Sequence, residues 1–408
     1  MRYFSYLLLA CLLAVFLFGT SGAASESLPA DPAGTQAASA VNAFAIDVYR
    51  QLAAESGNLF FSPYSISSAM AMTYAGARGD TAAEMAKALR FADHGPEIHA
   101  AMKSLQDSYD SIPEEDGTFS VANRLWLDKR EKLIPEYLTL VEKYYGAGVE
   151  TIDFLNAHER ARLEINDWVA QKTRDKIRDL LQGGDVTPDT SLILVNAVYF
   201  SSAWLEPFDK ELTREEPFHT GKGEQKTVPM MHRTGRFLYG ENSDAQWIRI
   251  PYSIWGFYMT IFLPRENESF TQLEEFESKL DAEALALWME ETRWREAALY
   301  MPKFKDERRY RLADILQKLG MDLAFSAKAD FSGMTEGPQK IDNVIHQAFI
   351  ELDEERTEAA AATAVVMTRT SLAIEPAVEF RADKPFIYCL TDDAGAILFM
   401  GRMASPDS

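Results

Sequence analysis

The sequence predicts an α+β fold, with one domain built around a large, mostly antiparallel sheet. Helical patterns fill the first third of the 408 residues, and strand patterns bounded by Gly, Pro, Asp and Asn fill most of the remainder. No composition change, long linker or internal repeat divides the stretch from Val41 to Ala404. Helices that come early and strands that come late favour an α+β domain over a regular alternation of the two.

The first 24 residues are typical of a secretory signal peptide, with Arg2 as a basic start, an apolar run ending at Phe18 and small residues up to Ala24. The apolar run is shorter than the roughly 20 residues that a membrane span needs, so we expect cleavage and no membrane span, with retention as an anchor as the alternative. Residues 25–38 are expected to form a flexible lead before a domain at 39–405. The protein is then expected to be secreted or extracytoplasmic, and periplasmic in a Gram-negative cell.

Local signals place the helices in order. Ser39 is a candidate cap for a first helix whose apolar face runs from Val41 to Leu52. Ser62 is expected to cap a second helix, with Pro63 in its first turn. Thr81 and Glu84 have the spacing of a capping box. Further amphipathic helices are predicted over residues 136–145, 159–172 and 309–319.

Seven apolar, β-branched or aromatic runs predict strands, over residues 191–200, 246–252, 256–264, 297–304, 344–353, 385–392 and 396–403. Asn196 and His346 each interrupt such a run and must find hydrogen-bond partners if buried. From spacing alone, satisfied polar groups in the core are favoured over functional ones. Cys389, the only cysteine left after signal removal, is interpreted as a small buried hydrophobe without a disulfide partner.

Composition and motifs argue against catalysis and against several ligand classes. A formal charge of -21 repels phosphate backbones, so no nucleic-acid partner is expected. The sequence has no zinc-protease, redox, nucleophile-elbow or phosphate-loop motif, and the 6 histidines are scattered. His158 has a neighbouring Glu but no second ligand at helical spacing, which favours a solvated helix face. We therefore expect no enzyme activity, no cofactor and no metal.

The segment "TEAAAATAVVMTRTSL", residues 357–372, mixes two propensities. Ala and Glu favour helix, whereas the Val and Thr residues that follow favour strand. If residues 357–367 became part of a central strand, Thr357 and Glu358 would lie on opposite faces, and the only charge in this stretch, that of Glu358, would fall on one face. Pro is absent until Pro376, so no ladder hydrogen bond would be lost.

Several motifs in order resemble segments of the serpin family: "NLFFSPYSISSAMAMTYAGARGDTAAEM", "LILVNAVYFSSAWLEPF", "YMPKFK", "ELDEERTEAAAATAVVM" and "AVEFRADKPFIYCLTDDAGAILFMGRM". The resemblance covers roughly Val41 to Ala404. It implies a suicide inhibitor of serine endopeptidases, with cysteine endopeptidases as further possible targets, built on a five-stranded sheet with an exposed reactive-centre loop. The loop is attacked as substrate, and its amino-terminal part then inserts into the sheet as a strand. A monomer that binds its target protease covalently is expected.

The resemblance also assigns site residues. The hinge of the loop corresponds to Glu354, Arg356, Thr357, Glu358, Ala359, Ala360, Ala361 and Ala362. Small residues after Thr357 favour an inhibitor, whereas Arg356 stands where the family usually has Gly. Ser62, Ser65, Asn196 and His346 match the shutter, a polar cluster beneath strands that must part, and Trp204 matches the breach where insertion begins. A non-inhibitory serpin acting as carrier, chaperone or storage protein is the alternative.

The cleaved bond is predicted from two observations that disagree. The common family spacing, counted from Glu354, gives Thr370 before the cut and Ser371 after it, which suits an elastase-like or subtilisin-like protease. A loop shorter by one residue gives the bond between Arg369 and Thr370, which suits a trypsin-like protease with an acidic pocket. The spacing favours the first bond, and the second remains open.

Overall fold

The computed structural model describes residues 32–146, 148–220, 223–265, 270–355 and 376–406, which lie within one compact unit, Asp31–Ser408. The expected signal peptide lies outside the described residues. The expected flexible lead is wrong for residues 32–38, because α1 (Pro32–Leu52) already begins there. Ala37 and Ala38 are buried in the core, and this burial stabilises the extra helical turns. Ser39 is therefore an interior residue of α1 and not its cap.

Most other helices lie in the amino-terminal part of the chain. They are α2 (Pro63–Gly76), α3 (Gly79–Ala88), α4 (Glu97–Asp110), α5 (Pro135–Tyr145), α6 (Phe154–Lys172), α7 (Phe270–Ser278), α8 (Ala282–Glu290) and α9 (Ala313–Lys318). The predicted start of α2 is confirmed, since the Ser62 hydroxyl accepts a hydrogen bond from the Ser65 N–H at 3.2 Å and Pro63 begins the helix. The helix predicted over 309–319 is wrong in its first part, because residues up to Arg311 belong to a strand.

The capping box predicted at Thr81 and Glu84 does not form. Arg78 occupies the cap position of α3 without a side-chain hydrogen bond. The Thr81 hydroxyl instead accepts a hydrogen bond from the Asp330 N–H at 2.9 Å, and the Glu84 carboxylate accepts one from the Leu323 N–H at 2.8 Å. Both side chains therefore fix a loop distant in sequence, which a local motif does not reveal.

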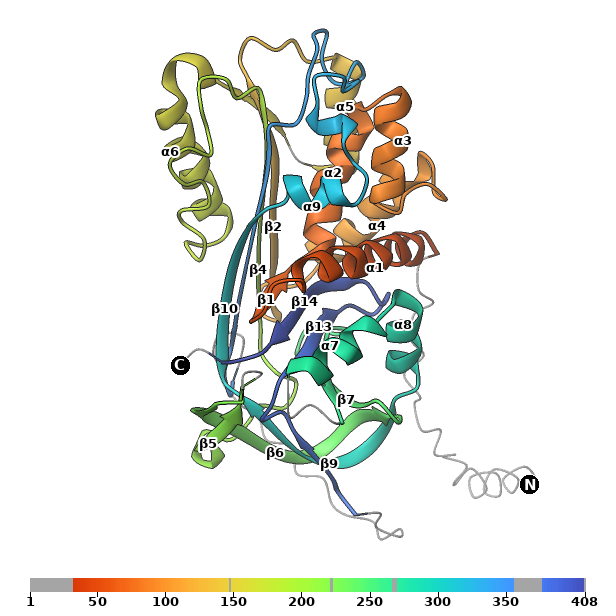
Figure 1. Cartoon of the computed structure of the whole chain (residues 1–408), viewed down its shortest axis with the longest axis vertical. Helices are drawn as coiled ribbons and strands as arrows, with labels where there is room; N and C mark the ends of the chain where they lie inside the picture. The colour runs from red at the N-terminus through yellow and green to blue at the C-terminus, as the bar shows by residue number, and fades with distance from the viewer. Residues whose placement is uncertain (1–31, 147, 221–222, 266–269, 356–375, 407–408) are drawn as a thin grey trace, which may run out of the picture. The chain divides into compact units, whose positions relative to one another are not determined.

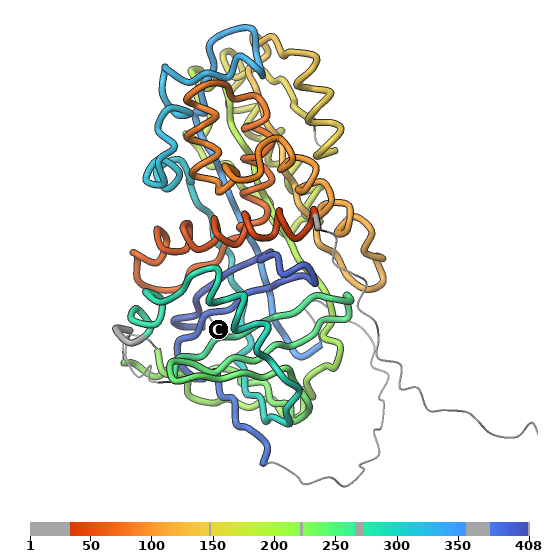
Figure 2. The backbone as a smooth tube through the Cα atoms, turned by 90° about the vertical axis from the view of Figure 1, so that its right-hand side faces the viewer, coloured from red at the N-terminus to blue at the C-terminus, as the bar shows by residue number. Residues whose placement is uncertain are grey.

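Nine of the described strands form one hydrogen-bonded sheet. Its order is β1 (Leu59–Phe61), β14 (Ile397–Met403), β13 (Phe386–Thr391), β8 (Tyr258–Pro264), β7 (Ala245–Pro251), β6 (Gln225–Glu241), β9 (Arg293–Pro302) and β12 (Val378–Arg381), with β5 (Arg214–His219) also paired to β6. Only β9 and β12 pair in parallel among these described strands. Figure 2 shows α1 between this sheet and the helices α2 to α5.

A five-stranded sheet carries the candidate site. Its order is β10 (Phe304–Arg311), β11 (Asn343–Leu352), β4 (Leu192–Ser202), β2 (Gly117–Asp128) and β3 (Val149–Ile152). Antiparallel pairing dominates the protein as expected, but this sheet is mixed, because β11 pairs with β4 and β2 with β3 in parallel. Helix α6 covers one face of this sheet, and α2 lies on the other (Figure 1).

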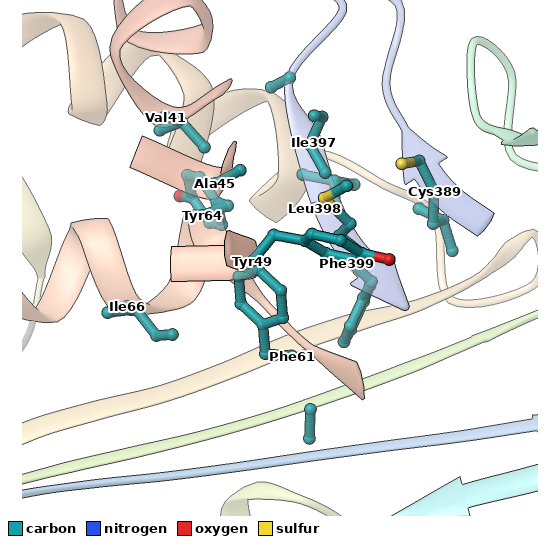
Figure 3. Packing of buried hydrophobic residues seen from close by; sticks show 14 of the residues in the cluster. Val41, Ala45, Tyr49, Phe61, Tyr64, Ile66, Cys389, Ile397, Leu398 and Phe399 are labelled. Carbon is teal, nitrogen blue, oxygen red and sulfur yellow. The ribbon is translucent and has the colours of Figure 1, made fainter. Parts of the chain in front are cut away.

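The main core lies between α1, α2 and the carboxy-terminal strands. Figure 3 shows Val41, Ala45 and Tyr49 of α1 in the same cluster of buried side chains as Phe399 of β14. Cys389 of β13 is only 1% exposed, and burial raises the pKa of its thiol. The prediction that this cysteine is a small buried hydrophobe is confirmed. A second cluster fills the space between α6 and the opposite face of the five-stranded sheet.

Candidate functional site

Four polar or aromatic side chains form a row across the five-stranded sheet. Asn123 of β2 is the register neighbour of Asn196 of β4, and Asn196 is the register neighbour of His346 of β11. Tyr310 of β10 is opposite His346, and the two rings stack with centroids 6.4 Å apart. We call Asn123, Asn196, His346 and Tyr310 the polar row. It crosses the sheet where β4 and β11 run parallel.

His346 is fully buried and uses both ring nitrogens. Its Nε2 accepts a hydrogen bond from the Ser62 backbone N–H at 3.1 Å, so the proton of the neutral ring belongs on Nδ1. The Nδ1–H then donates to the side-chain oxygen of Asn196. Burial lowers the pKa of His346 to about 3, which keeps the imidazole neutral at physiological pH. His346 therefore links α2, β11 and β4.

The first turn of α2 completes this network. The Ser62 hydroxyl donates to the Leu398 carbonyl of β14 at 2.5 Å. The Asn196 amide donates to the Ser65 carbonyl at 2.9 Å and to the Ser65 hydroxyl at 2.5 Å. A buried polar group without a partner costs about 1–3 kcal/mol, so these bonds stabilise one arrangement of helix and strands.

Asn123 belongs to the network but was not predicted. Its amide donates to the Ser65 carbonyl at 3.2 Å, and its side-chain oxygen accepts from the Asn196 amide. The helical patterns on both sides of residues 117–128 favour helix there, and no strand is predicted for this stretch. The aromatic and β-branched alternation in "TFSVANRLWL" was the signal that could have revealed β2.

A second set of contacts lies at the end of β4 and β11. The indole Nε1–H of Trp204 donates to the Asp353 carbonyl at 2.9 Å, and the Trp204 backbone N–H donates to the Glu355 carbonyl at 3.3 Å. The indole stacks on Tyr252 with centroids 4.5 Å apart. Because Trp204 is only 2% exposed, these contacts hold the residues after β11 against the end of β4.

Glu354 lies next to this contact and is also buried. Its carboxylate pairs with Lys303 at 2.8 Å and accepts a hydrogen bond from the Thr213 hydroxyl at 2.8 Å. Burial acts to raise the pKa of Glu354, but the hydrogen bonds from Lys303 and Thr213 outweigh it and leave the pKa below its ordinary value. The carboxylate therefore stays charged and fixes the chain just before residue 356.

The comparisons decide the family. A model of the serpin (serine protease inhibitor) family matches residues 39–406. The chain belongs to the serpin family. Leukocyte elastase inhibitor of Bos taurus is 40% identical, with 91% of this chain and 100% of that protein covered. A serpin-like protein of Thermococcus kodakarensis is 38% identical, with 90% of this chain and 85% of that protein covered.

Solved serpin structures agree with the fold. Uncleaved ovalbumin has a TM-score of 0.82 and 31% identity, with 90% of this chain and 99% of that chain covered. Thyroxine-binding globulin in complex with thyroxine has a TM-score of 0.81 and 30% identity, with 91% and 100% covered. The predicted α+β serpin domain is therefore confirmed.

For this serpin, the structure brings Ser62, Ser65, Asn196 and His346 into one network and bonds Trp204 to the carbonyls of Asp353 and Glu355. The hinge residues from Arg356 to Ala362 lie outside the described residues, as do Arg369, Thr370 and Ser371. Within the described part of the chain, no group of His, Cys, Asp and Glu side chains could hold a metal ion. The described helices include none long and apolar enough to cross a membrane.

Proposed function

We propose that this serpin is a suicide-substrate inhibitor of serine endopeptidases. The observation that carries the proposal is the parallel pairing of β4 and β11, whose shared edge we call the seam. The hydrogen bond between His346 and Asn196 bridges this seam. A strand that enters between two parallel strands and runs antiparallel to both can hydrogen-bond to each of them. The chain after β11 starts at the end of this seam, so residues 357–370 would enter as such a strand after a reversal of direction near Glu354.

Insertion would exchange one set of bonds for a larger one. The ladder from Asn343 and Ile193 to Phe349 and Tyr199 would break, together with the bond between His346 and Asn196. Two new ladders would form on either side of the entering strand. At roughly 1 kcal/mol per net hydrogen bond, the gain is on the order of 10 kcal/mol before apolar burial is counted. A native state above such a minimum is kept by a kinetic barrier.

The roles of the two contact sets follow from this model. We assign the shutter role to Ser62, Ser65, Asn196 and His346, whose bonds must rearrange when β4 and β11 part. We assign the breach role to Trp204, which lies where the entering segment would first meet the sheet. Cleavage after Thr370, with Arg369 as the alternative, would release the segment. A protein freed of its signal peptide outside the cytoplasm would meet such proteases.

The direct test mixes the mature protein separately with trypsin, an elastase and a subtilisin. We expect a covalent complex with at least one of them that survives boiling in SDS. Mass spectrometry of the released fragment then locates the bond, since a new amino terminus at Ser371 supports cleavage after Thr370 and one at Thr370 supports cleavage after Arg369. If every protease cleaves the loop and is released active, the inhibitor proposal fails.

A non-inhibitory carrier is the second candidate function. It is favoured by the similarity to thyroxine-binding globulin, which was solved in complex with thyroxine. The two candidates differ in the effect of loop cleavage on thermal stability. Insertion predicts a sharp rise in the unfolding temperature of the cleaved protein, whereas a carrier that does not insert its loop keeps the original temperature.

A further inference from the structure

Residues 173–190, which connect α6 to β4, cross the seam between β4 and β11; we call them the strap. Lys176 Nζ lies 5.9 Å from the centre of the Tyr199 ring and 5.7 Å from that of Phe349. Tyr199 and Phe349 are register neighbours on the two strands. The strap also buries apolar side chains in the cluster under α6, namely Ile177, Leu180, Leu181 and Val186. The strap therefore lies on the α6 face of the seam.

The strap is attached to α6 on one side of the seam. The Asn166 amide of α6 donates to the Leu181 carbonyl at 2.9 Å, and the Leu181 N–H donates to the Asn166 oxygen at 2.8 Å. These two bonds are neutral and buried. Water has little access to replace them, so this attachment is expected to persist while the sheet rearranges.

On the other side of the seam the strap is attached to β10 by an ion cluster. The Asp185 carboxylate is fully buried and pairs with Arg309 and Arg311. It also accepts the Gln182 N–H at 2.7 Å, and Arg309 Nε donates to the Leu180 carbonyl at 2.5 Å. The Arg311 side chain is 55% exposed, so water and salt reach this attachment.

We propose that the ion pairs of Asp185 with Arg309 and Arg311 control the rate at which β4 and β11 separate. This inference rests on the proposed inhibitory function. Because β10 lies beyond β11 in the sheet order, a strand entering beside β11 moves β10 away from β4 and α6. The two attachments of the strap must then move apart, and the more solvent-accessible one, at Arg311, is the one that releases. Weaker pairs should speed insertion and shorten the life of the native state.

The first experiment needs no protease. It measures amide hydrogen exchange of residues 173–190 in the intact wild-type protein and compares it with the exchange in intact variants. Asp185→Asn keeps the shape and one acceptor oxygen but removes the charge. We expect strap amides to exchange faster by on the order of tenfold, as when a charge-assisted hydrogen bond becomes a neutral one. Arg311→Gln should act in the same direction. Asp189→Asn makes the same charge change at an exposed strap position and should leave exchange unchanged.

The second experiment cuts the loop at low temperature and times the appearance of heat-stable protein. We expect Asp185→Asn to become heat-stable faster than the wild type, and Asp189→Asn to match the wild type. If hydrogen exchange of the strap is unchanged in Asp185→Asn, the proposal is overturned. It is also overturned if exchange is faster but the insertion rate is unchanged. In both cases the proposed inhibitory function still stands. If the cut wild type never becomes heat-stable, the inhibitory function itself fails, and the proposed control fails with it.

Discussion

The backbone N–H of Ser62 donates to Nε2 of His346 at 3.1 Å and joins the first turn of α2 to β11. Replacing His346 by Ala removes this acceptor and also the donor to Asn196. Each buried group left without a partner costs about 1–3 kcal/mol, so we expect a clearly lower thermal unfolding midpoint. His219→Ala, at an exposed position, is the control. An unchanged midpoint in the His346 variant would show that the network does not stabilise the native state.

Two buried histidines and one buried aspartate should change the stability of the protein in opposite directions as the pH falls. Burial lowers the pKa of His346 to about 3 and that of His99 to about 4, so between pH 6.5 and about 4 only the unfolded chain protonates them. Their contribution to stability is therefore lost as the pH falls. Burial raises the pKa of Asp392 to about 6, so this carboxyl takes up a proton on folding and acts in the opposite sense between about pH 6 and 3.8.

Because the histidines and Asp392 act in opposite senses, removing one of them should change how the thermal midpoint depends on pH. Between pH 6 and 4, the thermal midpoint of Asp392→Asn should fall more steeply than that of the wild type, because the compensating group is gone. The midpoint of His346→Gln should fall less steeply. Thermal scans of the three proteins over this range test the prediction, and three parallel profiles would contradict it.

Glu354 and Glu355 offer a matched pair of ion-pair deletions. Glu354→Gln removes the partner of Lys303 at a carboxylate that is only 5% exposed, and we expect a loss of about 1 kcal/mol or more. Glu355→Gln removes the half-buried partner of the solvent-exposed Lys210, and we expect a clearly smaller loss, because water screens this pair. Thermal midpoints measure both, and equal losses would argue against a special role of Glu354.

Trp204→Phe should separate stacking from hydrogen bonding. The ring can still stack on Tyr252, but the Asp353 carbonyl loses its indole donor, at a cost of about 1 kcal/mol. Trp255→Phe, at a residue 76% exposed, should change the free energy of unfolding by no more than about 0.5 kcal/mol. If Trp204→Phe leaves the free energy of unfolding unchanged, the hydrogen bond from the indole to the Asp353 carbonyl does not stabilise the native state.

Arg356→Gly tests the unusual hinge residue. If Arg356 slows insertion, Gly should raise the fraction of protease trapped relative to the fraction of inhibitor merely cleaved. Thr357→Arg provides the opposite change and should convert the inhibitor into a substrate, because a charged bulky side chain would have to enter the core. Quantified SDS gels of reactions with the reactive protease measure both fractions. An equal partition in all three proteins would exclude hinge control.

Sequence patterns predicted the strands that carry Asn196 and His346 better than the distant residues that these strands contact. The apolar runs around Asn196 and His346 marked β4 and β11, and the capping signal at Ser62 marked the start of α2. Strand β2 was missed because its alternation lies between strong helical patterns. The failed capping box at Thr81 has a related cause, since the side chains of Glu84 and Thr81 bind a loop 239 and 249 residues away. Such distant contacts depend on tertiary packing, which local propensity does not encode.

The burial of Cys389 in β13 gives this protein a built-in chemical probe. In the protein lacking residues 1–24 it is the only thiol, and burial keeps it protonated and therefore unreactive. It lies in the nine-stranded sheet, apart from the five-stranded sheet that would open during insertion. A thiol-reactive dye should therefore label molecules that unfold but leave molecules that insert their loop unlabelled, so that a single reagent distinguishes inactivation by denaturation from inactivation by conformational conversion.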